Sequence, residues 1–145
     1  MLKLSIQDGD RPDIVAEKFY DDSRLDWLVL LPNELHDRYY QWPLSQREFE
    51  EFIRKRYGSI ATAQGQIKQY EQILSSAQVL NDGTVVPERF VIVDETTYNS
   101  LASDSRRILY AYDYEDRVNE KRRNIKLLDS SLASEVVRAA RRTFR

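Results

Sequence analysis

The sequence predicts an α+β fold: a short N-terminal strand with two helices, then further helices, a small sheet and a C-terminal helix. Three observations support this prediction. Residues 2–6 alternate apolar and polar side chains, as a half-buried strand does. Several segments begin with helix-capping residues and then repeat apolar side chains at helical spacing. The run Asn-Asp-Gly-Thr at residues 81–84 lies between two apolar pairs, which is typical of a β-hairpin.

Two helices are expected after the first strand. Pro12 suits the first turn of a helix, where its missing N–H is no loss, and Asp13 complements the helix dipole. The second helix, at about residues 23–31, is apolar nearly all round, which indicates burial on more than one side. One of those sides is available for a partner. Trp27 and Leu30 are therefore candidate interface residues.

An aromatic-rich, irregular segment follows at residues 36–44. We expect it to be a loop that is anchored by its Trp-Pro pair. Ser45 then begins a helix, because Glu48 completes a capping box with it, and Gly58 ends that helix. The candidate interface residues of the loop are Tyr39, Tyr40, Trp42 and Pro43.

Residues 60–77 are predicted to form a second long helix, although Gly65 inside it lowers the helix propensity. Apolar side chains spaced by three and four residues form a short seam that requires one partner helix, either in the same chain or in another. The seam consists of Ile60, Ala63, Ile67, Tyr70, Leu74 and Ala77.

The remaining third alternates strands and helices. The hairpin at 78–86 is followed by predicted strands at 90–93, 108–112 and 125–128, a helix at 114–123, and a last helix capped by Asp129. The apolar stripe expected to face inward on that last helix is Leu132, Val136, Ala140 and Phe144.

Charge is distributed unevenly along the chain. Residues 1–115 hold 13 Lys/Arg and 20 Asp/Glu, a net charge of −7, whereas residues 116–145 have a net charge of +5. The basic end could fold onto the acidic body of its own chain, remain a solvated face, or bind an acidic neighbour. Nucleic acid is disfavoured because the pI is about 5.5. The candidate interface arginines are Arg122, Arg123, Arg138, Arg141 and Arg142.

Composition excludes several classes of protein. Cysteine is absent, which excludes disulfides, thiolate zinc sites and cysteine nucleophiles. No apolar run approaches the ~18 residues of a membrane span, and residues 1–6 lack the apolar region of a signal peptide. We expect a protein that is made and kept in a cytoplasm-like compartment, without membrane association.

No catalytic, cofactor or metal site is predicted. The single histidine, His36, lies in a loop, and one histidine among scattered serines and acids does not indicate a catalytic triad. Asp8, Asp10 and Asp13 suit a turn and a helix start, and no calcium-loop pattern follows them. The four glycines are too far apart for a phosphate-binding loop.

The opening of the chain resembles a LysM module, a small β-α-α-β fold that binds glycans containing N-acetylglucosamine. The chain departs from that pattern after the second helix, because residues 42–45 lead into a helix where the second strand is expected. The resemblance implies a LysM-like unit at residues 1–44 and an assembly region of helices and a small sheet at 45–145, packed as one compact body. It is carried by Gly9-Asp10, Ile14-Val15-Ala16, Tyr20 and the apolar helix that ends at Asn33.

A longer resemblance is carried in order by Asp-Gly-Asp-Arg-Pro-Asp at 8–13, the helix with Trp27, Asp-Arg-Tyr-Tyr-Gln-Trp-Pro-Leu-Ser at 37–45, and residues 112–128. Together these segments are similar to a small baseplate wedge protein of contractile-tailed bacteriophages, a family that begins with a LysM-like domain. The resemblance implies a structural subunit, with no enzymatic activity, that clamps neighbouring wedge proteins around the tail hub.

The same resemblance implies several copies per particle, location in the tail baseplate of the virion, and assembly in the host cytoplasm. The implied partners are other baseplate wedge and hub proteins, without nucleic acid, membrane or cofactor. Two alternatives stay open. The chain could be a glycan-binding module of the LysM type, or a peptidoglycan-degrading enzyme, for which the sequence offers no catalytic residues.

Overall fold

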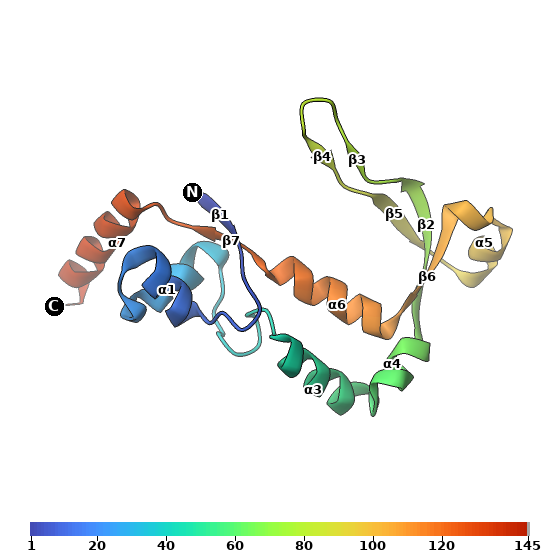
Figure 1. Cartoon of the computed structure of the whole chain (residues 1–145), viewed down its shortest axis with the longest axis horizontal. Helices are drawn as coiled ribbons and strands as arrows, with labels where there is room; N and C mark the ends of the chain where they lie inside the picture. The colour runs from blue at the N-terminus through green and yellow to red at the C-terminus, as the bar shows by residue number, and fades with distance from the viewer. Residues whose placement is uncertain (145) are drawn as a thin grey trace. The chain divides into compact units, whose positions relative to one another are not determined.

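The computed structural model describes residues 1–144, which form seven α-helices, three short 3-10 helices and small antiparallel sheets (Figure 1). The predicted α+β fold, including its C-terminal helix, is confirmed. The α-helices are α1 (Pro12–Tyr20), α2 (Asp26–Leu30), α3 (Gln46–Tyr57), α4 (Ile60–Gly65), α5 (Glu95–Ser100), α6 (Ala111–Arg122) and α7 (Ser130–Thr143). The strands are β1 (Leu2–Ser5), β2 (Ile67–Ser75), β3 (Gln78–Val79), β4 (Val85–Val86), β5 (Arg89–Val93), β6 (Arg106–Tyr110) and β7 (Asn124–Leu127).

The described residues form two compact units. The first combines residues 1–51 with residues from 117 onward, and the second contains residues 52–116. The boundary falls within α3 and α6. The LysM-like unit expected at residues 1–44, and its packing with 45–145 as one body, stay predictions.

The first unit is held together by a strand pair from distant parts of the sequence. β1 pairs antiparallel with β7, with Leu2 opposite Leu127 and Leu4 opposite Ile125 (Figure 1). Helices α1 and α2 pack beside this pair and share its core. The buried residues of that core are Ile6, Val15, Ala16, Val29, Trp42, Ile125 and Leu127.

The helix expected at 23–31 is shorter and interrupted. A 3-10 turn, Ser23–Leu25, precedes α2, and a second one, Leu31–Asn33, follows it. Asp22 caps the first turn by accepting a hydrogen bond from the Arg24 N–H. Leu28 and Val29 are fully buried, whereas Trp27 is 37% exposed, and a partner on the exposed side stays a prediction.

The capping box of α3 is present as predicted. Ser45 Oγ accepts a 3.3 Å hydrogen bond from the Glu48 N–H, and the Glu48 carboxylate accepts a 3.0 Å bond from the Ser45 N–H. Asp8 adds a further cap, since its carboxylate accepts a 2.8 Å bond from the Gln46 N–H. Gly58 adopts a φ of +88° just after the helix, a conformation that glycine adopts without strain.

The long helix predicted for residues 60–77 is wrong. The helix ends at Gly65, and Ile67–Ser75 form the central strand of the order β5-β2-β6. Gly65 lacks the helix propensity to continue the helix, and pairing on both sides of β2 stabilises the extended form of its Ile and Tyr residues. The apolar spacing therefore reflected a strand between two neighbours and not a helical seam.

The other strands of the second unit form close to their predicted positions, whereas helix α5 was not predicted and residues 111–112, expected in a strand, begin α6. The hairpin forms with Val79 opposite Val85, and Gly83 has a φ of +84° in its turn. On one face of the three-stranded sheet, the Tyr98 ring from α5 lies 4.9 Å from the Tyr70 ring. The Arg106 guanidinium lies 4.7 Å from the centre of the Tyr98 ring, which fixes α5 to β6.

The buried face of α7 differs from the predicted one. Ala133 is buried and Val136, Val137 and Ala140 are half-buried, whereas Leu132 and Phe144 are exposed. The inward stripe thus follows i, i+3, i+4 and i+7 from Ala133, and one small residue allows α7 to approach Leu28 and Leu128 closely.

Asp129 caps α7 and should make this helix sensitive to acid. Its carboxylate accepts hydrogen bonds from the Leu132 N–H at 3.0 Å and the Ser131 hydroxyl at 2.7 Å, and these bonds lower the pKa of Asp129. A lowered pKa means that the stabilisation is present above the ordinary pKa and is lost as the pH falls through the lowered value.

We expect faster amide exchange at the start of α7 as the pH falls below about 4, after correction for intrinsic rates. Asp129→Asn should keep the cap without this pH dependence, and identical profiles for both proteins would contradict the assignment.

Candidate interaction surfaces

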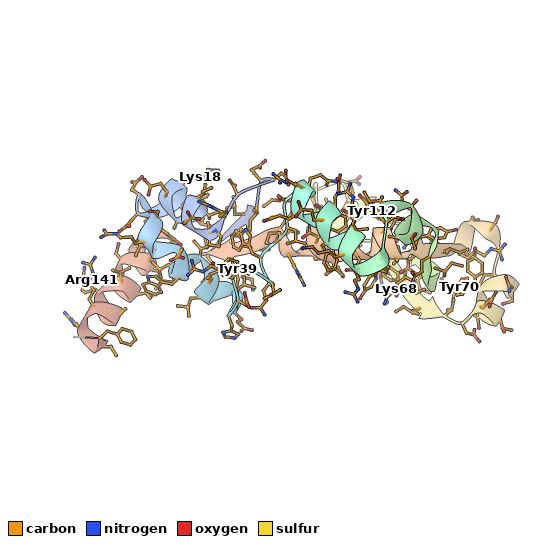
Figure 2. All side chains as sticks on the ribbon, turned by 90° about the horizontal axis from the view of Figure 1, so that it is seen from below. Lys18, Tyr39, Lys68, Tyr70, Tyr112 and Arg141 are labelled. Atoms are coloured by element: carbon orange, nitrogen blue, oxygen red, sulfur yellow. The ribbon has the colours of Figure 1, made fainter. Side chains whose placement is uncertain are left out.

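The loop at residues 36–45 is anchored by its tryptophan. Trp42 is 6% exposed, and its Nε1–H donates a 2.7 Å hydrogen bond to the Asp10 carbonyl oxygen. Pro43 is also buried. In contrast, Tyr39, which is labelled in Figure 2, is 78% exposed, and Tyr40 is 80% exposed. Of the four interface candidates in this loop, the structure places two in the interior and two in solvent.

Two predicted interface arginines hold this loop in place. Arg122 donates a 3.0 Å hydrogen bond to the Tyr40 carbonyl oxygen. Arg123 has a side chain only 14% exposed and donates to the Leu44 carbonyl oxygen at 3.2 Å, while its Nε pairs with Glu120 at 2.8 Å. Their described contacts lie within the chain, and their contact with a partner stays a prediction.

Asn119 is a structural residue that sequence reasoning missed. Its side-chain amide brackets Leu44, accepting from the Leu44 N–H at 2.8 Å and donating to the Leu44 carbonyl oxygen at 3.1 Å. Most residues around it in the sequence are charged, and nothing in the sequence marks Asn119 as buried. These two hydrogen bonds show that a side chain of α6 holds the main chain of the loop at Leu44.

The outer side of α7 carries basic and apolar side chains together. Arg138, Arg141 and Arg142 are exposed, and among the described residues none of the three makes an ion pair or hydrogen bond within the chain. Arg141 is labelled on α7 in Figure 2. The three arginines line a groove of about 660 Å³ together with Phe19 and Tyr20. Burial raises the pKa of Tyr20, whose hydroxyl donates a 2.9 Å hydrogen bond to the Leu128 carbonyl oxygen.

A second hollow continues this surface. Trp27, Ala140, Arg141 and Phe144 line a cavity of about 550 Å³. Leu30, the other candidate of α2, is half-buried against the core instead. The structure therefore brings Trp27 together with Arg141 and separates both from Leu30. We call Trp27, Arg138, Arg141, Arg142 and Phe144 the α7 surface.

The second unit contains a buried charge network that the sequence did not reveal. Glu71 on β2 is fully buried, and its carboxylate accepts hydrogen bonds from Arg107 at 2.9 and 2.7 Å. Arg107 also pairs with Glu88 at 2.7 Å. Glu88 and then Glu71 raise the pKa of the Arg107 guanidinium. The residues lie on separate strands or loops, so no local sequence pattern marks the network.

Within the described part of the chain, His, Asp and Glu side chains form no group of three that could hold a metal ion. No helix in residues 1–144 has the length and apolar character to cross a membrane. His36 lies exposed at the start of the loop.

Comparison with known protein families gives a match that covers nearly the whole chain. A search of curated proteins found no match. Residues 1–139 match the family model described as base plate wedge protein 53. The match includes both units and all but the last turn of α7. Because it covers far more than half of the sequence, the chain belongs to the phage base plate wedge protein 53 family, whose members are structural proteins of the virion tail.

Proposed function

We propose that the chain is a non-enzymatic baseplate subunit that clamps neighbouring wedge proteins around the tail hub, in several copies per particle. Its proposed partners are other wedge and hub proteins, and its assembly is proposed to occur in the host cytoplasm. The observation that carries the proposal is the α7 surface, where exposed arginines that make no ion pair or hydrogen bond with residues 1–144 lie beside exposed aromatic rings. Arginine and aromatic residues are enriched at protein interfaces.

The proposed contact of the α7 surface is an acidic patch on a neighbouring wedge subunit. Arginine forms bidentate pairs with carboxylates, which gives such a contact directional specificity. Each exposed pair contributes only about 0.2–1 kcal/mol, so a single substitution should have little effect. Three simultaneous reversals should block docking because like charges at an interface are costly.

The test is the triple variant Arg138→Glu, Arg141→Glu and Arg142→Glu. We expect the purified variant to melt close to the unmodified protein, because the three side chains are exposed, and to fail to rescue particle assembly. The matched control reverses Lys55, Arg89 and Lys121, which are exposed elsewhere and give the same change in charge. Normal assembly with the triple variant would refute docking through α7. Loss of folding would show instead that the basic end packs on its own chain.

A glycan-binding role is the second candidate, and it rests on the architecture of the first unit. In the first unit β1 is followed by α1 and α2 and pairs with β7, which comes much later in the chain. This pairing supports the proposal that Asn124–Leu127 serve as the second strand of a LysM-like module. A groove of about 460 Å³ lies beside the turn between β1 and α1, and Tyr39 contributes an exposed ring to it. Chitin or peptidoglycan pull-down at micromolar affinity, lost in Tyr39→Ala, would favour this role over the structural one.

A further inference from the structure

The strand pair of the first unit has one closed edge and one open edge. On the outer edge of β7, the Asn33 side chain makes the hydrogen bonds that a neighbouring strand would make. Its amide oxygen accepts from the Lys126 N–H at 2.8 Å, and its NH2 donates to the Lys126 carbonyl oxygen at 2.8 Å. The same NH2 also donates to the Val29 carbonyl oxygen at 2.8 Å, which ties the cap to α2. This edge is thereby occupied from within the chain.

The register determines which groups of β1 point outward. Because the N–H of Lys126 is used by Asn33, Lys126 and the opposite residue Lys3 form a non-hydrogen-bonded pair. The Ile6 N–H donates to the Arg123 carbonyl oxygen at 2.8 Å, which confirms the alternation. The N–H and C=O groups of Lys3 and Ser5 therefore point away from β7. Among the described residues no other element pairs with them.

The solvent face of the strand pair carries like charges opposite each other. Lys3 and Lys126 are direct cross-strand neighbours, and both are exposed. Two cations at such a position destabilise a strand pair unless an anion lies between or beside them. Residues 3–5 and 124–126 line a hollow of about 420 Å³ there. The other face of β1 is apolar, with Leu2 51% exposed beside the half-buried Leu4.

We propose that the open edge of β1 binds an extended segment of another protein in which acidic and apolar residues alternate. The main chain of that segment would pair with Lys3 and Ser5, as in other cases where a strand is added to a sheet edge. Its acidic side chains lie on the face of Lys3 and Lys126, and its apolar side chains cover Leu2 on the opposite face. A second copy of this chain is disfavoured as the occupant, because pairing of β1 with itself would bring four lysines onto one face.

The test uses the full chain, labelled for NMR, and two synthetic peptides, (Glu-Val)4 and (Lys-Val)4. We expect (Glu-Val)4 at millimolar concentration to slow amide exchange of Lys3 and Ser5 at least about tenfold, and (Lys-Val)4 to have no effect. The double variant Lys3→Glu and Lys126→Glu should reverse this preference. The control double variant Lys55→Glu and Lys121→Glu carries the same charge change and should keep the original preference.

Ser5→Pro tests the main-chain contribution separately. It removes an N–H that points away from β7, so the pairing of β1 with β7 keeps its hydrogen bonds. We expect this variant to melt close to the unmodified chain and to bind (Glu-Val)4 at least about tenfold more weakly.

Three results would overturn the proposal: no binding of (Glu-Val)4, binding without protection of the Lys3 and Ser5 amides, or protection that grows with protein concentration in the absence of peptide. The last result would identify a second copy as the occupant. Because no other baseplate protein is present, these results are independent of docking through the α7 surface.

Discussion

Replacing Arg107 with methionine is expected to lower the free energy of unfolding of residues 52–116 by about 3 kcal/mol. The substitution leaves the carboxylate of Glu71, which is fully buried, without the guanidinium that compensates its charge. Removing one partner of a buried ion pair typically costs 3–5 kcal/mol. The Arg107 side chain is 32% exposed, so water partly replaces it and the lower end of that range applies.

Hydrogen exchange of β2 amides in urea would measure this effect. Arg89→Met is the matched control, because Arg89 lies on the neighbouring strand β5 with an exposed side chain. Replacing Glu71 and Arg107 together with leucine should recover most of the lost stability, since no uncompensated charge then remains in the interior. If Arg107→Met lowers the free energy of unfolding no more than Arg89→Met does, the network contributes little to the stability of the second unit.

Trp42→Ala is expected to lower the free energy of unfolding of the first unit by about 3–5 kcal/mol. The substitution opens a cavity beside Val15 and Leu127 and also removes the hydrogen bond to the Asp10 carbonyl oxygen. Trp42→Phe keeps most of the buried area but loses the hydrogen bond and part of the packing, so it should cost about 1 kcal/mol from the hydrogen bond plus a smaller packing cost.

The second tryptophan provides the control for this prediction. Trp27 is 37% exposed, and Trp27→Ala should cost less than about half as much as Trp42→Ala. Urea denaturation followed by circular dichroism reports all three variants in the same way. A Trp42→Ala protein that melts within a degree or two of the unmodified chain would show that the loop does not depend on this side chain.

Local signals in the sequence predicted most of the individual elements. The capping box at Ser45, the hairpin around Gly83 and the Asp129 cap each depend on a few adjacent residues, and the structure contains all three. The failure at residues 60–77 has a different origin. The spacing of Ile67, Tyr70 and Leu74 fits a helix, and only pairing with β5 and β6, which are distant in sequence, selects a strand.

The interaction surfaces were predictable only by residue type. Tyr39, Tyr40, Arg138, Arg141 and Arg142 are exposed, as a surface role requires. No sequence pattern indicated that Arg122 and Arg123 bind loop carbonyl groups, because those contacts depend on bringing α6 to the loop. The same limit applies to Asn33, whose bond to Lys126 joins residues 93 positions apart.

The pairing of β1 with β7 determines when the first unit can fold during translation. β1 leaves the ribosome before the second unit, whereas its partner strand, Asn124–Leu127, is synthesised only after that unit. The free-energy cost of closing so long a loop is modest, because it rises by only about 0.6 kcal/mol for each doubling of the loop length. The rate is affected more strongly, since contacts between residues distant in sequence form slowly. Until residue 127 emerges, Ile6 and Val15 lack Ile125 and Leu127 to pack against.

A nascent chain that is broken off before β7 therefore keeps this apolar surface exposed to proteases and chaperones. The strands of the three-stranded sheet, by contrast, all lie within residues 52–116 and can pair earlier. Folding of the first unit therefore depends on synthesis of the chain as far as Leu127. A product that ends before β7 lacks the strand that pairs with β1, and it also lacks α7 with its three exposed arginines.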